Sequence, residues 1–288
     1  MRQLLVTEPQ VAKFSAFVHE RHRVYLKRAA GQPAPWTEDE VLRSYRFTNV
    51  YRELDTVTKW IADNWRNRNA DLPDLWFAMS VARLINWPET LAELPFPDRW
   101  DGRVAAKYVK VLTERQHTKQ KVFTSAYIIN QAVTGGYGMT KAEYLSTVVF
   151  PQLWSLRLSI RPREGDSLAE FHSRLMEGYG MGSFLAAQVV ADTKLVSPIL
   201  LEAHDWNTWA ASGPGSRRGL NILLNRPVDE RIRESVWLTA VRHLQKRLNE
   251  TRDKSVLLAA LDAQDVQNCL CEYSKYSRGY SRQRVNYS

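Results

Sequence analysis

Apolar residues recur at helical spacing along most of the chain. Phe14, Phe17 and Val18, for example, lie three and four residues apart. This spacing places side chains on one face of a helix, whereas the two-residue alternation of a half-buried strand is scarce. The pattern predicts an all-α, multi-helix globular protein of about a dozen helices joined by short loops.

Signals for helix ends support this prediction. Asp71 and Pro73 open an apolar run that ends before Pro88, and Thr140 with Glu143 forms a capping-box pattern. The irregular stretches between helices are too short to be flexible linkers. They lie near residues 30–37, 94–102, 133–139 and 160–167.

Composition narrows the class of protein. The chain has 288 residues, 44% of them apolar, which is enough for a core, so we expect one compact unit. If that unit subdivides, we expect parts at residues 1–120 and 121–288. The formal charge of +9 and the isoelectric point of about 9.6 favour an anionic partner such as nucleic acid.

The sequence also bears on location and metals. No stretch approaches the roughly 20 apolar residues of a membrane span, and the first residues lack a signal-peptide pattern. Cys269 and Cys271 are too close for a routine disulfide and too few for zinc, so we expect buried packing residues. We expect a cytoplasmic monomer with no membrane contact, no metal and no cofactor.

A glycine-rich turn stands between two apolar helical segments. Gly178, Gly180 and Gly182 precede Ser183 and a helix of small residues, and glycines at this spacing let backbone amides approach a ligand closely. The stretch resembles a helix-hairpin-helix module, in which backbone N–H groups hold a DNA phosphate. A glycine-lined turn between packed helices explains the glycines equally well.

An acidic residue, Asp205, follows this turn. In the helix-hairpin-helix DNA glycosylases, which this region resembles, the catalytic aspartate lies at such a place, so we expect a glycosylase-like core with Asp205 catalytic. The alternative is that Asp205 caps a helix at Trp206–Ser212. Gln188 and Asp192, one turn apart on the hairpin helix, are expected to support the site or simply to lie on a partly exposed face.

A second break in the helical pattern carries paired arginines. Gly213, Pro214 and Gly215 end one helix, and Arg217 and Arg218 lie in the first turn of the next. A helix N-terminus with two guanidinium groups suits a phosphate or carboxylate. An ordinary helix start with solvent-facing arginines is the alternative.

Charged and amide residues crowd residues 35–55. A predicted helix there places Arg46, Asn49 and Arg52 three residues apart on one face, where they could hold a phosphate ester, a carboxylate or a base edge. Asp55 lies three residues beyond Arg52 and is expected to lock its guanidinium group. Taken alone, the stretch also fits a surface helix laced with ion pairs.

Four separated blocks, in order, are similar to the alpha-glutamyl/putrescinyl-thymine pyrophosphorylase family, regarded as amino acid:DNA transferases of phage thymidine hypermodification. The blocks are residues 20–55, 178–195, 213–221 and 268–278. The helical domain of this family is also linked to 5-hydroxymethyluracil DNA kinases. The chain contains no GxxxxGK[ST] loop, so we do not expect it to bind ATP as a P-loop kinase.

The resemblance implies an enzyme that replaces the phosphate on activated 5-hydroxymethyluracil in modified duplex DNA with an amino acid or polyamine. The leaving group then needs cations and the amine must lose a proton. Under this interpretation Arg46, Asn49 and Arg52 bind substrate or phosphate, and Trp36 or Trp206 stacks on an extruded base. Lys275 joins the phosphate-binding set and pairs with Glu272 one turn away.

Two other functions fit the same residues. A monofunctional DNA glycosylase would use Asp205 to stabilise positive charge while it excises a modified base, for instance in anti-phage defence. The region of the hairpin has no lysine, so a lyase activity is not expected. The third interpretation is a DNA-binding protein without catalysis. This interpretation predicts that Asp205 and Arg46 can be replaced without loss of activity.

Overall fold

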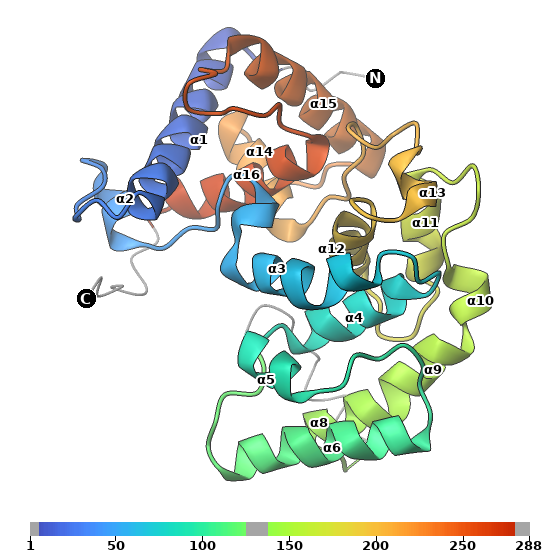
Figure 1. Cartoon of the computed structure of the whole chain (residues 1–288). Helices are drawn as coiled ribbons and strands as arrows, with labels where there is room; N and C mark the ends of the chain where they lie inside the picture. Colours follow the sequence, from blue (N-terminus) through green and yellow to red (C-terminus); the bar gives the residue numbers. More distant parts are fainter. Residues whose placement is uncertain (1–5, 125–137, 280–288) are drawn as a thin grey trace. The chain divides into compact units, whose positions relative to one another are not determined.

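The structure is a computed structural model that describes residues 6–124 and 138–279, and these residues form helices without a β-strand, as the sequence pattern predicts. They belong to two compact units (Figure 1). Unit 1 combines Met1–Asp55 with Asn207–Ser288, and unit 2 is Thr56–Trp206. The division differs from the boundary expected at residue 120, because the first long helix packs against the last two helices.

Unit 1 contains the residues at both ends of the described chain. Aromatic side chains fill its core: the rings of Phe14 and Tyr273 meet edge to face at 5.3 Å, and Trp237 is fully buried. Burying such large rings stabilises the contact between distant parts of the chain. Its helices are α1 (Glu8–Ala29), α2 (Glu40–Ser44), α14 (Pro214–Leu223), α15 (Glu234–Thr251) and α16 (Ala263–Tyr276), with a short 3-10 turn at Arg52–Leu54.

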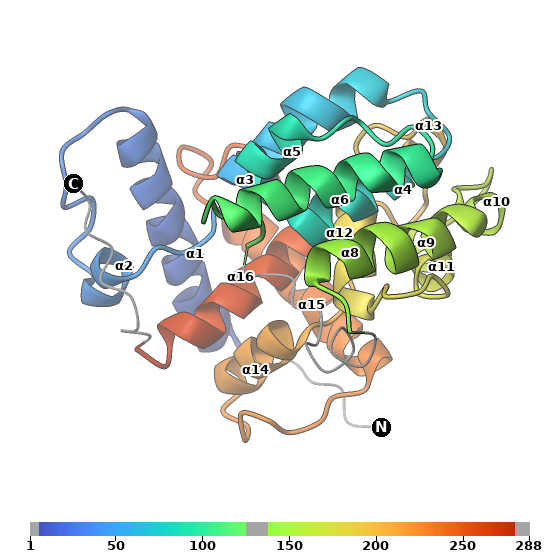
Figure 2. The same ribbon diagram turned by 90° about the horizontal axis from the view of Figure 1, so that it is seen from below.

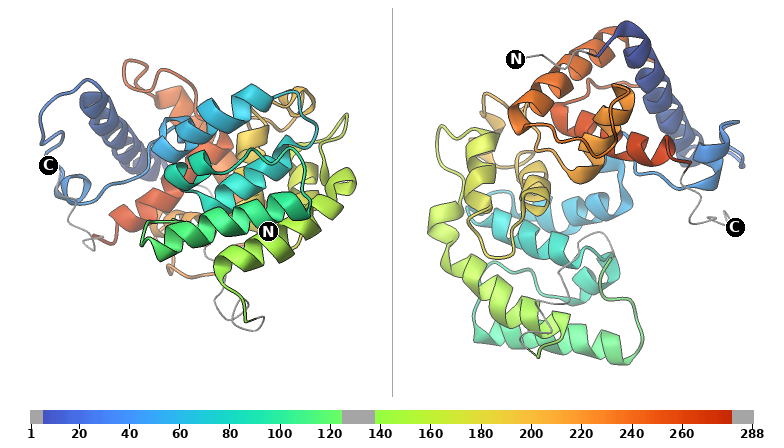
Figure 3. Two further views of the ribbon diagram at one scale, coloured as in Figure 1. Left: turned by 60° about the horizontal axis from the view of Figure 1, so that its bottom comes forward. Right: turned by 180° about the vertical axis from the view of Figure 1, so that it is seen from behind.

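Helices α14 and α16 pack at unusually close range (Figure 3). A Cβ atom added to Gly219 would lie 1.9 Å from the carbonyl oxygen of Leu270, and one added to Gly215 would lie 2.4 Å from the Sγ atom of Cys271. Only glycine leaves room for this approach. The two glycines therefore fix the position of α16 within unit 1.

Unit 2 is built around one helix that is buried on every side. All residues of α4 are buried, which explains the continuous apolar run after Pro73, and α4 lies against α12 (Figure 2). The helices of unit 2 are α3 (Thr56–Ile61), α4 (Leu75–Ile85), α5 (Pro88–Glu93), α6 (Gly102–His117), α8 (Lys141–Tyr144), α9 (Phe150–Ser155), α10 (Arg157–Ile160), α11 (Leu168–Leu175), α12 (Ser183–Thr193) and α13 (Pro198–Leu201).

Local side-chain bonds start several helices where the sequence predicts them. Thr140 accepts a hydrogen bond from the N–H of Glu143 at 3.2 Å, which confirms the capping box at α8. Pro88 begins α5 and so confirms the end of the preceding helix. Of the predicted irregular stretches, most of residues 133–139 lies outside the described residues.

The close packing of α14 on α16 gives a first test. Gly219→Ala is expected to lower the free energy of unfolding by about 2 kcal/mol or more, because the added methyl group meets the backbone of α16. Gly102→Ala, where a Cβ meets nothing within 4 Å, is the control and is expected to change stability by no more than about 1 kcal/mol. Urea unfolding followed by circular dichroism measures both, and equal stabilities would contradict the packing.

Candidate functional site

The stretch that carries Arg46 and Asn49 is extended, so the helix predicted there is wrong. Helix α2 ends at Ser44, Tyr45 has φ −135° and ψ 133°, and residues 46–49 have no regular structure. The side-chain amide of Asn49 donates to the carbonyl of Leu54 at 2.7 Å, and its backbone N–H donates to Asp55 at 2.8 Å. These local bonds offer the backbone an alternative to a helix. Arg46, Asn49 and Arg52 therefore share no helix face.

Asn49 is instead a junction of three segments of unit 1. Its carbonyl oxygen accepts from Arg21 of α1 at 3.3 Å and from Asn268 of α16 at 2.9 Å. Its side-chain oxygen accepts a longer bond, of 3.5 Å, from Arg28 of α1. The buried Asn49 thus holds the segment of residues 45–49 between two helices far from it in sequence.

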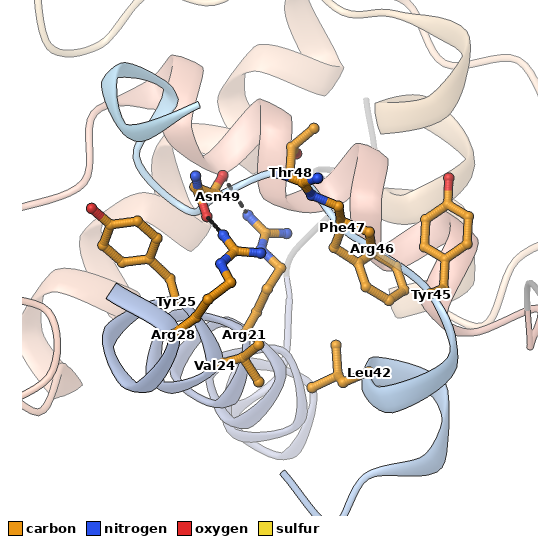
Figure 4. Close-up of a pocket in the computed structure, with 10 residues that line it drawn as sticks. All are labelled: Arg21, Val24, Tyr25, Arg28, Leu42, Tyr45, Arg46, Phe47, Thr48 and Asn49. Atoms are coloured by element: carbon orange, nitrogen blue, oxygen red, sulfur yellow. Dashed lines mark hydrogen bonds between the residues drawn. The ribbon is translucent and has the colours of Figure 1, made fainter. Parts of the chain in front are cut away.

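A narrow pocket opens beside Asn49, and Figure 4 shows the ten residues that line it. The pocket is shallow and opens to solvent, with a cavity volume of about 20 Å³. Three of the lining residues are arginines and none is a carboxylate. The lining consists of Arg21, Val24, Tyr25, Arg28, Leu42, Tyr45, Arg46, Phe47, Thr48 and Asn49. We call it the arginine pocket.

Arg21 is the most buried charge of the arginine pocket, with 4% of its surface exposed. One terminal nitrogen donates to Asn49 and to the Sγ atom of Cys269, and the guanidinium group lies 5.2 Å from the ring of Phe17. The Nε and second terminal nitrogen have no hydrogen-bond partner among the described residues. A buried guanidinium group in this state retains capacity to bind an acceptor.

Two carboxyl groups lie on or next to these segments: Asp55 is half-buried, and Glu272 of α16 is buried. Burial raises the pKa of Asp55, although the N–H of Asn49 and the charges of Arg21 and Arg52 oppose this. Glu272 accepts from Lys275 at 2.6 Å, which confirms the predicted pair, and its second oxygen has no partner among the described residues. Burial disfavours the charged form of Lys275, but the charge of Glu272 and its hydrogen bond outweigh this effect and raise the pKa of Lys275.

Lys275 connects this pair to the arginine pocket. Its Nζ atom lies 5.9 Å from the ring centre of Tyr45, a residue of the pocket wall. Burial raises the pKa of Cys269 to about 11 and also raises that of Cys271, which disfavours the nucleophilic thiolate form of both groups. Cys269 is fully buried, as predicted, whereas Cys271 is half-buried.

Sequence reasoning missed the contribution of α1. Arg21 and Arg28 lie seven residues apart and so share a helix face, a signal that was available in the sequence. His22 was also missed. Its ring stacks on Tyr25 with centroids 5.5 Å apart and meets Tyr51 edge-on, and burial lowers its pKa to about 4. The imidazole is therefore neutral at pH 7.

The glycine-rich turn joins α11 to α12 in unit 2. Gly180 has φ +79°, and a Cβ on Gly178 would lie 2.5 Å from the side chain of Leu153. Gly182 and Ser183 are exposed at the N-terminus of α12, where backbone N–H groups are available to an anion. Gln188 is half-buried further along the same helix.

Asp205 holds the start of another helix of unit 2. It is 5% exposed, and its two oxygens accept from the backbone N–H groups of Leu168 and Ala169, at 2.7 and 3.2 Å. The carboxylate therefore caps α11 from a distance. The expected helix at Trp206–Ser212 does not form, so Asp205 does not cap that segment.

Other predicted site residues have structural partners. Asp192 is fully buried and binds Arg83 of α4 through two hydrogen bonds of 2.6 Å. Arg217 pairs with Glu234 at 2.9 Å, and Arg218 pairs with Asp229 at 2.7 Å. These contacts stabilise α12 and the start of α14.

The two tryptophans expected to stack on a base also make intramolecular contacts. The ring nitrogen of Trp206 donates to the carbonyl of Lys194, whose Nζ atom lies 4.2 Å from the centre of the ring. The ring nitrogen of Trp36 donates to the carbonyl of Gln32 at 2.7 Å, and its own carbonyl accepts from Lys27. Trp36 remains partly exposed.

Comparisons with known proteins place the chain in a family. The family model described as the helical domain of 5-hmdU DNA kinase matches residues 8–285, so the chain belongs to this family. A curated relative, the 5-hmdU DNA kinase of Bacillus phage SP10, is 26% identical over 289 residues. The match covers 92% of this chain but 44% of the relative, so the chain spans less than half the relative's length. No solved structure matches.

The described residues also bear on metal binding and membrane insertion. Within residues 6–124 and 138–279, no group of three or more His, Cys, Asp and Glu side chains is placed to hold a metal ion. Over the same residues, no helix is both long and apolar enough to cross a membrane.

The capping role of Asp205 is open to direct measurement. Asp205→Ala is expected to lower the free energy of unfolding by about 1–2 kcal/mol, because two backbone N–H groups of α11 lose their acceptor. His204→Ala, at the exposed neighbouring position, is the control and is expected to change stability by less than about 0.5 kcal/mol. Chemical unfolding of both variants measures the difference, and an unchanged Asp205→Ala would exclude the cap.

Proposed function

We propose that the chain transfers an amine, from an amino acid or a polyamine, to phosphate-activated 5-hydroxymethyluracil in DNA. The observation that carries this proposal is the arginine pocket of unit 1, which residues 21–28 and 42–49 line and whose Asn49 also binds Asn268 of α16. Membership of the 5-hmdU DNA kinase helical-domain family supports a substrate that contains this base. The net charge of +9 and the exposed start of α12 suit a DNA backbone.

The reaction breaks the bond between the 5-methylene carbon and the ester oxygen and forms a carbon–nitrogen bond. The phosphate leaves with the bond's electron pair, and the amine loses a proton. Guanidinium groups of the arginine pocket stabilise the charge that develops on the leaving group. We assign the proton to the buried oxygen of Glu272 that has no partner among the described residues, and Lys275 holds the other oxygen.

A non-catalytic alternative is favoured by one specific observation. The curated relative is named a kinase, and the match leaves more than half of that relative uncovered, while this chain has no P-loop. Under this alternative, the helical chain positions DNA for a separate phosphoryl-transfer domain. The glycosylase alternative has less support, because both oxygens of its required aspartate, Asp205, bind the backbone of α11.

The transfer reaction is tested with defined DNA. Purified protein is incubated with duplex DNA that contains phosphorylated 5-hydroxymethyl-deoxyuridine and with glycine, serine, glutamate and putrescine, and the nucleosides are then analysed by mass spectrometry. A new amino-substituted nucleoside is expected. Arg46→Met is expected to lower its rate of formation by about tenfold or more, because the leaving group loses a cation.

Arg43→Met is the matched control, since Arg43 is an exposed neighbour on α2 outside the pocket lining and loses the same charge. It is expected to react at the rate of the parent protein. Unchanged nucleosides in every reaction, together with tight binding of the DNA, would reject the transfer reaction and support the DNA-positioning function. Free base with abasic sites would establish excision.

A further inference from the structure

We infer that the arginine pocket is an oxyanion subsite whose ligand-binding residues are Arg21 and Arg28 of α1, with Arg46 at its rim, and that it takes a phosphate-type anion. Neither α1 residue belongs to the predicted site, and the assignment of the anion as the leaving phosphate rests on the proposed function. The binding property itself follows from the geometry of unit 1.

The first argument is the state of Arg21. Arginine is almost never buried without a partner that neutralises it, because removing a charge from water is costly. Here the partners of its one bonded nitrogen are a neutral carbonyl and a thiol sulfur. Two further nitrogens are buried without an acceptor. A bound oxyanion would supply both the charge and the acceptors.

The second argument is the convergence of like charges. The guanidinium groups of Arg21 and Arg28 both reach Asn49, one at its backbone and one at its side chain, as Figure 4 shows. Two cations that meet at one neutral residue repel each other unless an anion lies between them. The pocket lining supplies no carboxylate. Asp55, whose charge interacts with that of Arg21, lies outside the lining and is bonded to the N–H of Asn49.

The third argument concerns which anion fits. A guanidinium group presents planar paired donors that match phosphate and carboxylate oxygens. Three arginines in one lining exceed what a single carboxylate charge requires, whereas a phosphate or pyrophosphate carries more charge and more oxygens. The hydroxyl-bearing side chain of Thr48 adds a neutral group to the same wall. These features favour phosphate over the carboxylate of an amino acid.

Asn49 and Asp55 act as positioning residues in this account. Asp55 fixes the backbone of Asn49, and Asn49 in turn holds both α1 arginines. Neither residue needs to touch the anion.

The test is a binding measurement that does not depend on turnover. Isothermal titration calorimetry of the full chain at low ionic strength uses pyrophosphate, inorganic phosphate and glutamate as separate ligands. Pyrophosphate is expected to bind with one-to-one stoichiometry and more tightly than glutamate. Arg28→Met is expected to weaken pyrophosphate binding about tenfold or more, since a charge-assisted hydrogen bond is lost.

Arg43→Met is again the matched control and is expected to keep the parent affinity within about twofold, because screening limits the effect of an exposed charge. Circular dichroism spectra show whether Arg28→Met is folded, and Arg28→Lys, which keeps the charge but lacks the planar fork, is expected to bind with intermediate affinity.

Three results would overturn the inference: no binding of pyrophosphate, equal weakening by Arg28→Met and Arg43→Met, or tighter binding of glutamate than of pyrophosphate. Its failure is distinguishable from failure of the transfer reaction. Pyrophosphate that binds through Arg28 without any amine transfer leaves the subsite in place and rejects the reaction. Transfer that proceeds at the parent rate in Arg28→Met keeps the reaction and rejects the subsite.

Discussion

The hydrogen bonds of Asn49 are the constraint on which the candidate site depends. Through its backbone and side chain this one residue joins α1, the extended residues 45–49 and α16. The bond from its N–H to Asp55 keeps the segment from continuing α2 as a helix. Without this junction the guanidinium groups of α1 would have no shared partner, and the basic lining of the pocket would not assemble.

The packing in the rest of unit 1 holds together the segments that meet at Asn49. Aromatic packing of α1 on α16 and the glycine contacts of α14 with α16 fix the helices that meet at Asn49. Asn268, which donates to the Asn49 carbonyl, and Lys275, which reaches the wall residue Tyr45, both belong to α16. A small shift of α16 would therefore disturb the site at two points, and this dependence explains the need for glycine at the α14 contact.

Much of the fold was predictable because it depends on local signals. The all-α class follows from apolar spacing, and the capping box at Thr140 and the pair of Glu272 with Lys275 depend on residues three positions apart. The extended stretch at Asn49 was not predictable in this way, because its local bonds to Leu54 and Asp55 act together with bonds from Arg21 and Asn268, which are far away in the sequence. The capping of α11 by Asp205 was not predictable for the same reason, since that helix begins at Leu168.

We propose that the modified base binds at the arginine pocket. Photo-crosslinking tests this binding most directly. Duplex DNA that carries a photoreactive group in place of the activated 5-substituent is bound to the full chain and irradiated, and the crosslinked peptides are identified by mass spectrometry. The account predicts crosslinks within residues 21–28 or 45–49. Crosslinks confined to residues 176–184 or to the peptide around Asp205, with none in unit 1, would contradict it.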